Sequence, residues 1–138
     1  MANMAKIAEE FFEACEAGKG WEACRAYCMP DAAFSSQAEP LAQTRSIEAY
    51  TEWMKGLLKF MPDGRYELVS FAVDEKRQNV SAFARFLATH TGEGGPCPPT
   101  GKNTKTDYVY VMEFEGDKIR QMTKIWNSGW AMRELGWM

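Results

Sequence analysis

The segment Asn79–Thr91, NVSAFARFLATHT, determines the fold class, because its residues alternate in character with a period of two. One set of alternate positions is apolar except for its last residue, His90: Val80, Ala82, Ala84, Phe86, Ala88 and His90. The other set mixes polar and apolar residues: Ser81, Phe83, Arg85, Leu87 and Thr89. Such alternation predicts a β-strand with one buried face. The same period recurs in three further segments, which we also predict to be strands: Tyr66–Val73, Thr104–Phe114 and Lys118–Asn127.

The chain before this region has a helical period instead. Apolar residues recur at helical spacing over 4–17, 21–28 and 47–61, and in the first segment the glutamates, Glu16 included, fall mostly on the opposite side. Ser46 is the expected N-cap of the third helix, and Pro30-Asp31 is expected to end the second. A short strand around 33–36 and a last helical segment over 130–137 complete the prediction. Helices followed by a run of strands indicate an α+β fold.

Length and charge limit the classes of partner. A chain of 138 residues predicts one domain over 1–138. Sixteen Lys and Arg against 19 Asp and Glu give a net charge of −3, which argues against nucleic acid or an anionic membrane as partner. No apolar run approaches the ~20 residues that span a bilayer. The acidic N-terminal segment is unlike a secretory signal, so we expect a cytoplasmic protein.

The four cysteines are interpreted as reduced thiols in that compartment. Cys24 and Cys28 are four residues apart on the expected second helix and could contact one metal ion, but the chain has a single histidine and neither Cys15 nor Cys97 has matching ligand spacing. We therefore predict buried core thiols and no metal site. The sequence also has no glycine-rich phosphate loop after a strand and no nucleophile elbow, and we expect no cofactor.

Aromatic residues make up 13% of the chain, which is more than packing alone needs in a domain of this size. The rings, with small side chains such as Ala82, Ala84 and Ala88 beside them, favour a cavity for an uncharged, ring-shaped molecule over a plain core. The ligand-binding candidates that share the inward faces are Tyr50, Trp53, Phe86, Tyr108, Met122 and Trp126.

Lys124 shares a strand face with Met122 and Trp126, and this face should meet the helices. An amine that loses hydration there has a lowered pKa unless an acid pairs with it. It could then act as a general base or form a Schiff base, with Tyr110 on the neighbouring strand donating a hydrogen bond to a substrate oxygen. The alternative is a structural pair between Lys124 and a buried acid, or a lysine that leans out of the cavity.

His90 is the third catalytic candidate, as a proton shuttle at the cavity rim. The alternative, which we favour, is that it anchors the backbone of the Gly- and Pro-rich loop that follows. Arg85 falls on the opposite strand face, where we expect an outward or dimer-facing salt bridge and no contact with a ligand.

Four short segments resemble one known family: Thr89-His90-Thr91-Gly92, Pro98-Pro99-Thr100-Gly101-Lys102, Glu115-Gly116-Asp117-Lys118-Ile119 and Arg133-Glu134-Leu135-Gly136. They resemble the SnoaL-like polyketide cyclase branch of the nuclear transport factor 2-like superfamily. The resemblance implies a cone-shaped, curved antiparallel sheet wrapped by the N-terminal helices, the cystatin-like α+β barrel. It also implies a deep apolar pocket and a homodimer.

The same resemblance places the family's acidic base at Lys124, its neighbouring Trp at Trp126 and its assisting polar residue at Tyr110. A second acidic position falls on Asn127, which joins the ligand-binding candidates. An amine in place of the carboxylate means that the cyclase mechanism does not transfer to this chain. We therefore expect a small-molecule-binding protein, an isomerase, cyclase or hydrolase acting on an apolar cyclic or carbonyl-bearing ligand. The alternative is a non-catalytic ligand-binding or protein-interaction module.

Overall fold

The computed structural model describes residues 3–138, so that residues 1 and 2 of the predicted domain lie outside the described part. Helices come first and strands dominate the second half, which confirms the α+β class. Within residues 3–138, no helix combines the length and the apolar character needed to cross a membrane. The elements follow in the order α1 (Met4–Glu16), α2 (Trp21–Cys24), the 3₁₀ helix η1 (Arg25–Tyr27), β1 (Cys28–Ser36), the 3₁₀ helix η2 (Glu39–Leu41), α3 (Ile47–Phe60), β2 (Arg65–Asp74), β3 (Asn79–Thr89), β4 (Asn103–Glu115), β5 (Lys118–Trp126) and α4 (Ser128–Leu135).

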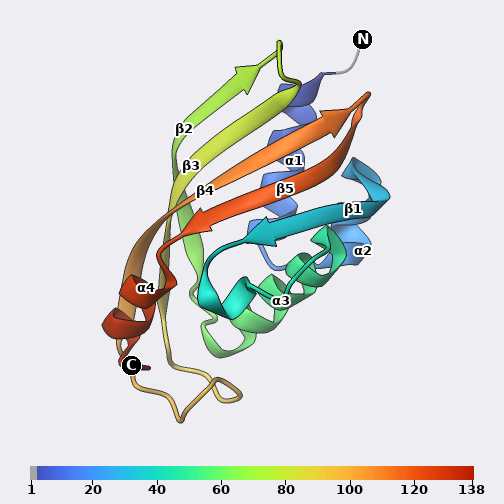
Figure 1. Ribbon diagram of the computed structural model, residues 1–138. Coiled ribbons are helices and arrows are strands. Elements are labelled where there is room, and N and C mark those ends of the chain that lie inside the picture. Colours follow the sequence, from blue (N-terminus) through green and yellow to red (C-terminus); the bar gives the residue numbers. More distant parts are fainter. Residues whose placement is uncertain (1–2) are drawn as a thin grey trace.

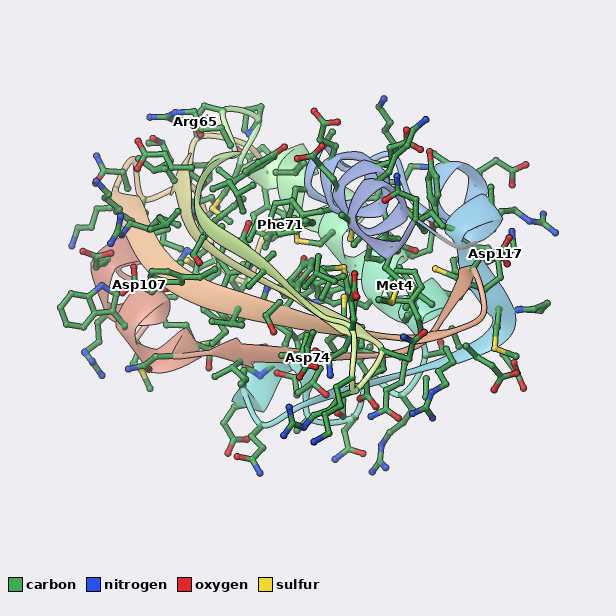
Figure 2. The ribbon with its side chains drawn as sticks, turned by 90° about the horizontal axis from the view of Figure 1, so that it is seen from above. Met4, Arg65, Phe71, Asp74, Asp107 and Asp117 are labelled. Atoms are coloured by element: carbon green, nitrogen blue, oxygen red, sulfur yellow. The ribbon has the colours of Figure 1, made fainter. Side chains whose placement is uncertain are left out.

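The strands form one curved sheet in the order β1-β5-β4-β3-β2, with α1 and α3 on one side of it (Figure 1). Strands β2 to β5 pair antiparallel, whereas β1 joins β5 in parallel, so the sheet is mixed. Figure 2, seen from above, shows both helices on the same side of the sheet, with Arg65 and Asp117 at opposite ends of the molecule. The core therefore lies between these helices and the sheet.

Side-chain caps set the beginnings of the three longer helices. The Asn3 side chain accepts a hydrogen bond from Lys6 N (3.1 Å) at α1, and Ser46 Oγ accepts one from Ala49 N (3.0 Å) at α3, which confirms the predicted cap. Asn127 Oδ1 accepts one from Trp130 N (3.1 Å), so α4 begins two residues before the predicted start at Trp130.

The predicted second helix over 21–28 is wrong in its last turn. Helix α2 ends at Cys24, and Cys28 already begins β1, which is longer than the predicted strand over 33–36. Pro30 does not end a helix but lies within β1. Proline has no N–H group to donate to a neighbouring strand. It is tolerated in β1 because β1 is an edge strand, with a neighbouring strand on one side only.

Regular alternation also failed at one position of β5. It placed Ile119 on the outer face with Thr123 and Ile125, yet Ile119 is fully buried while Ile125 is 60% exposed. The pairing of β4 with β5 shifts between Glu113 and Phe114, and this bulge turns Ile119 inward. On the outer face, the predicted salt bridge of Arg85 is confirmed, with Asp107 as its partner at 3.1 Å.

Gly92 follows β3 at a point where two backbone segments come close together. Its N–H donates to Phe60 O (2.9 Å), and a Cβ on Gly92 would lie 2.8 Å from both Lys59 O and Phe60 Cα. Backbone atoms cannot move aside as a flexible side chain can. We expect Gly92→Ala to lower the free energy of unfolding by about 1–3 kcal/mol, measured by urea denaturation.

Gly56→Ala is the matched control for this prediction, because a Cβ on Gly56 in α3 would meet no atom within 4 Å. It should raise the free energy of unfolding by about 0.5–1 kcal/mol, since alanine favours the helix. A Gly92→Ala protein as stable as the Gly56→Ala protein would contradict the close approach.

Candidate active site

A cavity of about 240 Å³ lies between α3, the helix-covered face of the sheet and α4. Its wall is largely apolar and aromatic, and the amine of Lys124 and the carboxyl of Glu16 also border it. Its lining comprises Glu16, Pro40, Trp53, Met54, Leu57, Phe60, Met61, Phe86, Pro96, Thr104, Thr106, Tyr108, Lys124, Trp126, Ala131, Met132, Leu135 and Trp137.

Lys124 of β5 brings a buried amine to this cavity, and the residue as a whole is only 6% exposed. Its Nζ donates to the Tyr50 hydroxyl at 3.0 Å and lies 4.4 Å from the centroid of the Trp126 ring. The rings of Tyr50, Trp53, Tyr108 and Tyr110 also lie within 6.0 Å of Nζ. Burial lowers the pKa of Lys124 to about 8, although the negative charge of Glu16 acts in the opposite direction and raises it. A part of the population therefore holds a free amine near neutral pH.

Glu16, the last residue of α1, is the buried acid of the site and is 3% exposed. Its Oε1 accepts a hydrogen bond from the Tyr108 hydroxyl and its Oε2 one from the Tyr110 hydroxyl. Burial raises the pKa of Glu16, while the charge of Lys124 and the two hydroxyl donors oppose this rise.

Two tyrosines lie behind the cavity wall and join these groups. Tyr50 from α3 and Tyr110 from β4 are fully buried, and their hydroxyls are hydrogen-bonded to each other. Burial raises the pKa of both phenols, so each stays neutral across the physiological range. Phe12 of α1 packs against Tyr110 with ring centroids 5.2 Å apart, which holds the tyrosine against the helix.

The structure brings many of the predicted site residues to this place. Lys124, Trp53, Phe86, Tyr108 and Trp126 border the cavity. Tyr50 and Tyr110 contact Lys124 or its hydrogen-bond partner from behind the wall.

Two further ligand-binding candidates lie elsewhere. Met122 is buried in the core and does not border the cavity, and Asn127 is exposed and caps α4. Ala82 and Ala84, expected to leave room for a ligand, instead pair in register with the large Tyr110 and Tyr108 and do not border the cavity.

His90, the third catalytic candidate, lies outside the cavity lining and is fully buried. Its Nδ1 accepts hydrogen bonds from Trp137 Nε1 (2.9 Å) and Thr100 N (3.4 Å). Its backbone pairs with the far end of the same loop, at Lys102 O and Gly101 N. This histidine therefore anchors the loop over 91–102 and the C-terminal Trp137, which is the alternative that the sequence favoured.

Glu16 and Trp137 are the site residues that sequence reasoning missed. Glu16 was grouped with the exposed glutamates of its helix, yet it follows the buried Phe12 by four residues and so lies on the same face. That spacing was the available signal. Trp137 borders the cavity from beyond the end of α4, where no periodic pattern indicates an inward direction.

The sequence was compared with models of known protein families. The model of the SnoaL-like polyketide cyclase family matches residues 6–135. The chain belongs to the SnoaL-like polyketide cyclase family. A search of the curated proteins found no match.

Several solved structures share the fold of this SnoaL-like chain. AclR from Streptomyces galilaeus, a candidate hydroxylase, is 23% identical, with a TM-score of 0.77 over 99% of this chain and 84% of that one. A candidate SnoaL-like cyclase from Jannaschia sp. CCS1 is 15% identical, with a TM-score of 0.79 over 98% of this chain and 95% of the other. IdmH from Streptomyces antibioticus, a candidate polyketide cyclase, is 16% identical, with a TM-score of 0.75 over 97% of this chain and 99% of that one. At these identities the likeness shows the fold.

The predicted cone fold is therefore confirmed, with the parallel β1–β5 pair as an added detail. Membership of the SnoaL-like family supports a small-molecule-binding protein. The family does not specify the reaction, because the chemistry of a shared fold depends on the side chains placed in its site.

Proposed function

We propose that this SnoaL-like protein binds an uncharged, ring-shaped carbonyl compound in the cavity and moves a proton on the carbon next to the carbonyl group, with Lys124 as general base. The observation that carries the proposal is the buried amine of Lys124, which borders an aromatic cavity and has its pKa lowered to about 8. A general base is most effective when its pKa lies near the working pH.

The wall of the cavity supports an uncharged ligand with one polar end. The hydroxyl of Thr104 already donates to Glu134 (2.8 Å), and that of Thr106 accepts from Trp126 Nε1 (3.1 Å). A charged ligand would lose its hydration here with few groups to replace it. Lys124 and Glu16 remain as the groups that can meet a carbonyl function, while the aromatic wall accepts a flat ring.

The proposed step uses both ionisable groups. The free amine of Lys124 takes a proton from the carbon next to the carbonyl, and the protonated carboxyl of Glu16 gives its proton to the carbonyl oxygen. The ligand becomes an enol, Lys124 an ammonium group and Glu16 a carboxylate, so that protons balance. The raised pKa of Glu16 supports this role, because it retains the acid form at a higher pH than an exposed glutamate does.

The test follows hydrogen exchange of β-tetralone, a flat bicyclic ketone, in deuterated water by NMR. We expect the protein to accelerate loss of the hydrogens next to the carbonyl, with a bell-shaped dependence of the rate on pH. The rate should fall at low pH, where Lys124 is an ammonium group, and at high pH, where Glu16 has lost its proton, because the step needs the free amine and the protonated carboxyl at the same time. Exchange no faster than in buffer, or a rate that rises with pH without reaching a maximum, would overturn the proposal.

Borohydride separates this role from a Schiff base at the same residue. With β-tetralone and borohydride together, we expect Lys124 to remain unmodified by mass spectrometry, because the proposed base forms no bond to carbon. A reduced adduct on Lys124 would assign it as a nucleophile instead. Quenching of Trp126 fluorescence by β-tetralone without exchange would indicate a binding module without chemistry.

A further inference from the structure

A continuous chain of hydrogen bonds runs behind the cavity wall from Lys124 to Glu16. Lys124 Nζ donates to the Tyr50 hydroxyl (3.0 Å), and the Tyr110 hydroxyl donates to Glu16 Oε2. Each phenol has one hydrogen, and that of Tyr110 is already used. The bond between the two hydroxyls must therefore be donated by Tyr50 to Tyr110. Every donor in the chain thus points from Lys124 toward Glu16.

We propose that this chain is a proton relay that returns the proton acquired by Lys124 to Glu16 between turnovers. The inference rests on the proposed function, which leaves Lys124 with one proton more and Glu16 with one proton fewer each time the ligand leaves the site as the enol. A path through the protein between the two groups restores the starting state without proton exchange with solvent.

The arrangement of the four residues supports a relay. Both end groups border the cavity, whereas Tyr50 and Tyr110 do not and are fully buried. Their hydroxyls therefore have no substrate to contact from where they lie. Within residues 3–138, no ion pair joins Lys124 directly to Glu16, so the phenols provide the connection between them.

The transfer is balanced proton by proton. Lys124 gives a proton to the Tyr50 oxygen, Tyr50 gives its own to Tyr110, and Tyr110 gives its own to Glu16. Only N–H and O–H bonds break and form, and both phenols are neutral before and after. Burial raises the pKa of both phenols, so the steps must be concerted and no tyrosinate accumulates.

Other titratable groups around the chain do not interrupt it. From α1, Cys15 Sγ lies 4.0 Å from the Tyr110 hydroxyl, and burial raises the pKa of this thiol well above its ordinary value, which keeps it protonated. From β4, Tyr108 donates to the other carboxyl oxygen of Glu16 but stands outside the chain. Tyr108→Phe therefore removes one hydroxyl donor from Glu16, as Tyr110→Phe does, while it leaves the path intact.

The test uses NMR of protein labelled at lysine Nζ and the glutamate carboxyl carbon, at pH values around 8 and without any ligand. In the wild type and in Tyr108→Phe, we expect one averaged resonance each for Lys124 Nζ and the Glu16 carboxyl carbon, because the relay exchanges their protonation states rapidly. In Tyr50→Phe and Tyr110→Phe, separate resonances for the protonated and deprotonated forms should appear, since exchange must then pass through solvent.

Identical line shapes in all four proteins, or separate resonances already in the wild type, would overturn the relay. Two variants cut the chain at different oxygens, so the result does not depend on either one alone, and amide spectra verify that each keeps the fold. Because no ligand is used, this outcome is distinct from a failure of the ketone exchange experiment.

Discussion

Lys124→Met should abolish the exchange of β-tetralone hydrogens, with a loss of about a hundredfold or more in rate. Methionine keeps the length and fills the space between the aromatic rings, but it has no group that takes a proton. A positioned general base contributes about 10²–10⁴-fold to a proton transfer, and the whole of this contribution would be removed. The measurement is the catalysed exchange rate above buffer, at the pH where the wild-type rate is highest.

Two further variants make this result specific. Lys124→Arg keeps a cation among the rings, but guanidinium does not release its proton at accessible pH, so it should be as inactive as Lys124→Met. Lys105→Met removes an exposed lysine that pairs with Glu67 at 3.7 Å, and it should keep the wild-type rate. Activity in Lys124→Arg would show that a positive charge, and not a base, is what the site supplies.

Glu16→Leu should lower the free energy of unfolding by about 3–5 kcal/mol in urea denaturation at neutral pH. The variant leaves the buried ammonium of Lys124 without its acidic partner and removes the acceptor of the Tyr108 and Tyr110 hydroxyls. The Lys124 ammonium keeps its desolvation penalty without the opposing charge of Glu16, and leaving a buried charge uncompensated typically costs about this much. Unpaired buried donors add to the loss.

Glu13→Leu on the exposed side of the same helix is the control and should change stability by no more than about 0.5 kcal/mol. Glu16→Gln should fall between the two, since its carboxamide oxygen still accepts from a tyrosine while the charge is lost. Equal stability of Glu16→Leu and Glu13→Leu would show that the polar network contributes nothing to folding.

Strand alternation and helix caps were predictable because they depend on residues a few positions apart. The alternation of 79–91 identified β3, and Ser46 marked the beginning of α3. The same reasoning failed at Cys28 and Ile119. A helix that ends early and a bulge in a strand are both determined by pairing with distant strands, here β1 with β5 and β4 with β5.

The local sequence established the α+β order of elements, the inward face that carries Lys124 and Trp126, and the aromatic character of what surrounds them. It did not reveal Glu16 as the acid of the site. Glu16, Tyr50, Tyr110 and Lys124 come from α1, α3, β4 and β5, and their hydrogen bonds join residues between 60 and 94 positions apart in the chain. Only the packing of these helices against the sheet brings the amine, the phenols and the carboxyl group into one chain. No periodicity along the sequence encodes contacts of that length.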